Sequence, residues 1–139
     1  MSIKSIYTTS AVLGMFLVFG LFSEMVQAQP ENQPTEHNLV IKKINNEWRV
    51  VQADDETKST IMVNRGDRVR WVVEGSGASF QFEDENLFGG NTRVIQENNP
   101  LVLAVGNSAR IGTFTYAVFI HTDQVFARGE SPPRIIVVR

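Results

Sequence analysis

Few side chains in this sequence could bind a metal or act as a nucleophile. Cysteine is absent from the 139 residues, and the two histidines are His37 and His121. The methionines are Met1, Met15, Met25 and Met62, so none follows His121. An electron-transfer copper centre needs a thiolate together with two imidazoles. The sequence therefore excludes a thiolate copper centre and predicts no cofactor, and a weak copper site made by His37 with His121 stays open as the alternative.

Four further motifs are more typical of turns than of sites. Arg65-Gly66-Asp67 matches an integrin-binding tripeptide, but it also suits a β-turn between strands. The acidic runs Asp54–Glu56 and Glu83–Glu85 lack the ligand spacing of a calcium loop. The segment Asn86–Thr92 holds two glycines without the Lys-Ser/Thr ending of a phosphate loop, so we expect a strand connection with a small satellite core.

No residue pattern nominates a catalyst. The sequence contains no Gly-x-Ser-x-Gly elbow, and no nucleophile can be matched with a base. We therefore predict that the protein is not an enzyme.

The N-terminal residues 1–28 have the pattern of a signal peptide. Lys4 precedes the apolar run Ala11–Phe22, and Val26-Gln27-Ala28 fits the small-residue pattern that signal peptidase cleaves. The apolar run is too short to span a bilayer comfortably, although an uncleaved anchor is the alternative. The sequence thus predicts a periplasmic or secreted protein.

Residues 29–38 are polar and proline-containing, which predicts a disordered leader before a single domain over residues 39–139. The formal net charge of −2 differs from the positive charge that nucleic-acid-binding domains carry, so no nucleic-acid partner is predicted. A domain of this length can bury enough apolar surface to fold without disulfides.

Short runs rich in Val, Ile, Phe and Trp alternate with turn residues along the domain. Asn45-Asn46 suits the two-residue turn of an opening hairpin, because Asn tolerates positive φ angles. The pattern predicts an all-β sandwich of seven or eight strands with Greek-key topology. The expected strands are 39–44, 47–51, 60–63, 68–74, a segment around Phe80 and Phe82, 101–105, a segment in which Phe114, Tyr116 and Val118 alternate, and 134–138.

Two separated motifs resemble cupredoxins, the plastocyanin and azurin family. Val63-Asn-Arg-Gly-Asp-Arg-Val-Arg-Trp71 is similar to the family's Val-x-x-Gly-Asp-x-Val-x-Trp. Gly112-Thr-Phe-Thr-Tyr-Ala-Val-Phe-Ile-His121 is similar to its Gly-Thr-Tyr-Thr-Tyr-x-Cys-x-x-His run. In this alignment Val118 occupies the position of the copper-binding Cys. The segment Gly75-Ser-Gly-Ala-Ser-Phe-Gln-Phe82 would match the family's Gly-x-x-x-His-x-x-x-Phe, and aligning Phe82 with that Phe places Ala78 at the first copper-binding His. The resemblance implies a cupredoxin-like sandwich that has lost its blue-copper ligands, with His121 as a vestigial ligand position.

The resulting hypothesis is an exported, copper-free binding or accessory domain that acts through protein contacts. Its alternative is a copper protein with a degenerate site, acting in electron transfer or copper handling. The resemblance also implies that Gly75–Ser79 and His121–Pro133 converge at one end of the sandwich. We predict an unknown protein partner there, and Phe126 could instead fill the volume of the lost copper site. The partner-binding residues are predicted to be His121, Val125, Phe126 and Arg128.

Overall fold

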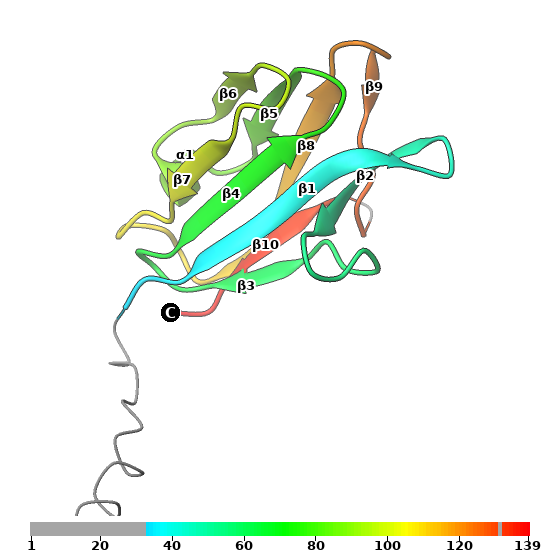
Figure 1. Cartoon of the computed structure of the whole chain (residues 1–139). Helices are drawn as coiled ribbons and strands as arrows, with labels where there is room; N and C mark the ends of the chain where they lie inside the picture. The colour runs from blue at the N-terminus through cyan, green and yellow to red at the C-terminus, as the bar shows by residue number, and fades with distance from the viewer. Residues whose placement is uncertain (1–32, 131) are drawn as a thin grey trace, which may run out of the picture. The chain divides into compact units, whose positions relative to one another are not determined.

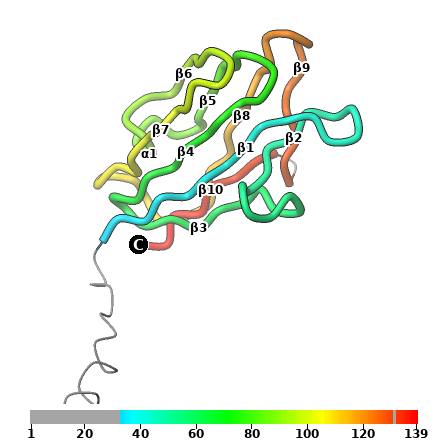
Figure 2. Tube along the Cα trace, viewed as in Figure 1, coloured from blue at the N-terminus to red at the C-terminus, as the bar shows by residue number. Residues whose placement is uncertain are grey.

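The computed structural model describes residues 33–130 and 132–139 (Figures 1 and 2). The predicted signal peptide, residues 1–28, lies outside the described residues, as does the start of the predicted leader. No helix within the described residues has the length and hydropathy to cross a membrane.

Two mixed sheets form the predicted all-β sandwich (Figure 1). One sheet has the order β2-β1-β4-β7, and the other has the order β3-β10-β8-β5-β6, with β9 added beside β8. Successive segments of the chain pass back and forth between the sheets, as in a Greek-key sandwich. The strands are β1 (Glu36–Ile44), β2 (Glu47–Gln52), β3 (Ile61–Val63), β4 (Arg68–Val73), β5 (Ala78–Phe82), β6 (Thr92–Ile95), β7 (Leu101–Ala104), β8 (Gly112–Ile120), β9 (Val125–Phe126) and β10 (Arg134–Val137).

The predicted opening hairpin is confirmed. Asn45 and Asn46 have φ angles of 52° and 64°, the left-handed values that a two-residue hairpin turn requires. The turn sets the register in which Ile44 lies opposite Glu47.

Strand β1 begins at Glu36, so the boundary predicted between leader and domain at Leu39 is wrong. The first residues of β1 pair in parallel with β4, where His37 lies opposite Val69. The carboxylate of Asp67 holds this strand start: its Oδ1 accepts from Thr35 N at 3.0 Å, and its Oδ2 contacts His37 Nε2 at 3.0 Å. His37 therefore belongs to the sheet, because the buried carboxylate of Asp67, 30 residues later in the sequence, pairs with its imidazole.

The same carboxylate confirms the turn interpretation of Arg65-Gly66-Asp67. Gly66 has a φ of 88°, and Asp67 Oδ2 accepts from Asn64 N at 2.9 Å. Asp67 is 4% exposed. An adhesion motif needs an accessible carboxylate, so this tripeptide is a structural turn.

One hydrophobic core lies between the sheets, with Trp71 at its aromatic centre. Phe80 packs 5.6 Å and Phe88 packs 5.5 Å from the Trp71 ring, both edge to face. Trp71 Nε1 donates to the Tyr116 hydroxyl at 3.2 Å, which satisfies two buried polar groups at once.

Three short elements lie outside the strands expected from the sequence: β6, β9 and the helical turn α1 (Glu85–Phe88). Asp84 caps α1 by accepting from Asn86 N, and Gly89 ends it in the left-handed conformation. The predicted satellite core is wrong, because Leu87 and Phe88 are buried in the main core.

Candidate functional site

The predicted segments meet where β8 ends, whereas from Arg128 on the second segment runs beside β2 and β8. His121 N donates to Gly77 O at 3.1 Å, and Thr122 N donates to Ser76 Oγ at 3.1 Å. These bonds fasten the turn that follows β8 to the loop that precedes β5. We call the surface formed by residues 75–79 and 121–127 the loop end; β1 starts at the other end of the molecule (Figure 1).

His121 lies on the outer face of the sheet at the loop end. Its Nε2 is 2.7 Å from Ser79 Oγ, and its ring centroid is 6.5 Å from that of Phe119. Gly77 provides the room, because a Cβ there would lie 2.9 Å from His121 Nδ1 and 2.9 Å from Ile95 O. The imidazole therefore has a hydroxyl partner, and it packs closely against the backbone at Gly77.

The positions aligned with copper ligands do not meet. Val118 and Ala78 are fully buried, so they face the core as the alternation of β8 predicts for Val118. His121 lies with Ser79 on the opposite face of the same sheet. Because side chains on two faces of a sheet cannot share one ion, His121 as placed cannot complete a site with positions 78 and 118.

His37 and His121 cannot share a metal ion within one molecule either. His37 is at the start of β1 and pairs with Asp67, whereas His121 follows the end of β8 at the loop end (Figure 1). Across residues 33–130 and 132–139, no three side chains of His, Cys, Asp or Glu gather as a metal site would require.

An uncharged row of side chains crosses four strands on the outer face beside His121. The strand register places Ser79 between Val94 of β6 and Phe119 of β8, and Phe119 opposite Phe126 of β9. The rings of Phe119 and Phe126 pack edge to face at 5.3 Å. Val94 is 60% and Phe126 is 63% exposed. We call Val94, Ser79, Phe119 and Phe126 the outer row.

A groove of about 510 Å³ adjoins the outer row at Phe126. Phe126 and Pro133 border it together with the small residues Ala117 and Ala127, while Arg128 stands at its rim. The Arg128 Nε contacts Glu47 Oε1 at 3.1 Å, and its side chain stays 74% exposed. The groove thus combines apolar walls with one accessible cation.

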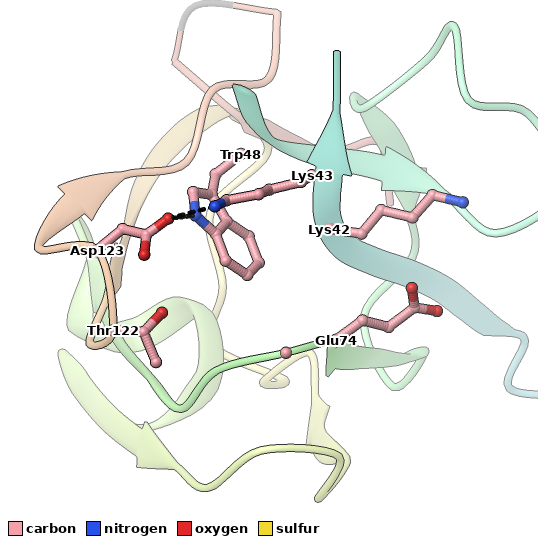
Figure 3. Close-up of a pocket in the computed structure, with 7 residues that line it drawn as sticks. Lys42, Lys43, Trp48, Glu74, Thr122 and Asp123 are labelled. Carbon is pink, nitrogen blue, oxygen red and sulfur yellow. Dashed lines mark hydrogen bonds and ion pairs between the residues drawn. The ribbon is translucent and has the colours of Figure 1, made fainter. Parts of the chain in front are cut away.

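A second, polar pocket of about 470 Å³ is bordered by Thr122 and Asp123, which follow β8 (Figure 3). Lys43 and Trp48 converge there on Asp123, whose Oδ2 is 2.8 Å from Lys43 Nζ and 2.7 Å from Trp48 Nε1. The hydrogen bond from Lys43, and to a smaller extent that from Trp48, holds the pKa of Asp123 below its ordinary value of 3.8. The pocket therefore places paired charges beside the loop end.

Of the predicted site residues, Phe126 and Arg128 border one groove, and His121 and Phe126 each lie near Phe119. Val125 pairs instead with the buried Ile120 and is 42% exposed. Sequence analysis placed Ser79 in a converging segment without predicting a contact for its side chain, and it missed Phe119 and Val94. One signal was available for Phe119: it is an aromatic residue out of phase with the buried Tyr116 and Val118 of the same strand.

No protein-family model matches the chain, and no curated protein matches it. Solved structures of the copper protein amicyanin are similar to it. The reduced Cu(I) form of one amicyanin variant at pH 4 has 15% identity and a TM-score of 0.42, over 73% of this chain and 82% of amicyanin. The reduced state of a second variant has 16% identity, a TM-score of 0.43 and the same coverage. TM-scores this low add nothing to what the strand order itself establishes.

Proposed function

We propose that this protein is an exported binding or accessory domain that contacts a protein partner through the loop end without copper. The observation that supports the proposal is the exposure of Phe126, which is 63% accessible within an uncharged row. Phe126 does not fill the interior beside Val118, so the structure contradicts the alternative of a filled copper volume. At protein interfaces, aromatic residues surrounded by a polar rim often contribute most of the binding energy.

Export is part of the proposal and has its own test. Cleavage after Ala28 predicts that the mature protein begins at Gln29. An intact mass that includes residues 1–28 would contradict cleavage and would favour a membrane-tethered domain.

The central experiment compares two exposed apolar residues. Phe126→Ala is expected to lose partner capture by the purified, tagged protein while keeping the melting temperature of the wild type. Ile111→Ala is the matched control, because Ile111 is 64% exposed and lies outside the outer row. A large drop in melting temperature for Phe126→Ala, or equal capture by both variants, would contradict a docking role.

The degenerate copper protein remains the competing function, and the same preparation tests it. Protein soaked in Cu(II) and then dialysed should retain no stoichiometric copper, because the imidazoles of His37 and His121 lie at different ends of the fold. Stoichiometric copper that His121→Ala removes would favour the competing function.

A further inference from the structure

We infer that the partner of the outer row is a second copy of this chain, which packs face to face across a two-fold axis between Ser79 and Phe119. The inference rests on the proposed function, since it names the partner of the surface that contains Phe126. It follows from the charge, the shape and the polar pairing of the row.

Charge distinguishes two adjacent rows of this face, because its charged residues Arg134 and Glu83 lie farther along the strands, beside Thr115. The outer row is Val94, Ser79, Phe119 and Phe126, and the adjacent register row consists of Thr92, Gln81 and Ala117. Two identical copies meet in these rows without like charges and without burying an ion. The outer face of the other sheet differs, because its outward positions include Lys42, Arg49, Arg68 and Arg70. Packing that face would require the desolvation of several charged groups, which is unfavourable unless each gains a partner.

Shape makes the outer row complementary to itself. Phe119 and Phe126 form a bulky half, and Ser79 and Val94 form a small half. In an isologous interface the same patch serves both subunits, so residue i contacts j and residue j contacts i. A two-fold axis between Ser79 and Phe119 therefore places each aromatic half over the small half of the other copy. The row crosses four strands, about 14 Å at the usual strand spacing, and face-to-face sheets pack about 10 Å apart.

The polar group in the row is already paired. Ser79 Oγ lies 2.7 Å from His121 Nε2, so covering Ser79 leaves its hydroxyl with a hydrogen-bond partner. The outer row also reaches the sheet edge at β6, where no further strand obstructs a second copy in the described part of the chain.

The first experiment measures mass against concentration by analytical ultracentrifugation of the mature protein, up to about 1 mM. Wild type should show a reversible monomer–dimer equilibrium, and Phe126→Asp and Val94→Asp should each weaken dimerisation at least about tenfold. Met62→Asp is the control, because Met62 is 59% exposed but lies outside the row. A monomer at every concentration, or equal weakening by all three variants, overturns the inference.

The second experiment tests the two-fold axis by disulfide cross-linking. Because the chain contains no cysteine, any disulfide must join the introduced residues. Val94→Cys mixed with Phe126→Cys should form disulfide-linked dimers faster than either variant alone. Cross-linking that is no faster in the mixture overturns the arrangement. If wild type is monomeric while Phe126→Ala still abolishes capture of another protein, the self-association proposal fails and the proposed function stands. If wild type is monomeric and Phe126→Ala captures as much protein as wild type, the self-association proposal and the proposed function both fail.

Discussion

At the scale of single residues, His121 has a different environment from Val118 and Ala78. Its imidazole is 2.7 Å from a serine hydroxyl on the outer face, while Val118 and Ala78 are packed in the core. The three side chains therefore serve two separate tasks: two fill the interior and one supports the surface row.

Val118→Ala should lower the free energy of unfolding by about 1–3 kcal/mol, because it removes buried methyl groups and leaves a cavity. Val118 is fully buried opposite Phe80. Denaturant titration measures the change, and Val102→Ala, at a 44% exposed position, is the control with a small expected effect. Equal stability of Val118→Ala and wild type would contradict the core assignment.

Asp67 makes stability depend on pH in the acid range. Burial raises its pKa, but the hydrogen bonds from Asn64, Thr35 and His37 outweigh burial and lower the pKa below the ordinary value of 3.8. A carboxyl whose folded pKa is lowered contributes stability that is present above the unfolded pKa and is lost as pH falls through the folded pKa.

Asp67→Asn should therefore reduce stability at neutral pH and flatten the loss of stability below about pH 4. The expected cost is about 1–3 kcal/mol, because buried backbone donors lose a charged acceptor. Urea titrations of both proteins from neutral to acid pH measure it. Parallel pH profiles for the two proteins would rule out this role.

At the scale of elements, the approach of the β8 turn to the loop before β5 depends on Gly77. A Cβ at this position would lie 2.9 Å from the backbone oxygen of Ile95, which cannot move aside as a side chain can. The close approach holds His121 against Ser79 and thereby sets the end of the outer row.

Gly77→Ala should destabilise the protein by about 1–3 kcal/mol, the usual range for overpacking, and should shift the NMR signals of His121. Gly90→Ala is the matched control. Its Cβ would meet the guanidinium of Arg93, the end of a flexible side chain that can move. Similar stability of the two variants would contradict the steric role of Gly77.

At the scale of the whole molecule, the aromatic core couples the two sheets into one unit that should unfold together. Trp71 of one sheet donates to Tyr116 of the other. Burial raises the pKa of the Tyr116 hydroxyl, an effect that the hydrogen bond from Trp71 only partly opposes. The folded protein therefore keeps this proton above pH 10, where the unfolded chain loses it.

Stability should then fall with rising pH above about 10, by up to about 1.4 kcal/mol per pH unit from this group. The contribution is fully present below the unfolded pKa and is lost as pH rises toward the folded pKa. Tyr116→Phe should reduce that slope, which thermal unfolding from pH 9 to 11 measures. An unchanged slope would assign alkaline unfolding to other groups.

Much of the fold is readable from local sequence. The alternation of Val69, Trp71 and Val73 predicts a strand with one buried face, and Asn45-Asn46 predicts the hairpin turn. The start of β1 was not readable, because Glu36 and His37 become strand through pairing with β4 and through the distant Asp67 carboxylate.

What the sequence by itself determined is the all-β sandwich, the inward face of β8 and the absence of a thiolate for copper, because side-chain period and residue inventory are local properties. Only the tertiary structure decided that Val94, Ser79, Phe119 and Phe126 form one row, and that His121 turns away from Val118. The physical reason is that cross-strand register joins segments far apart in the chain, and a shift of one residue would move each side chain to the other face.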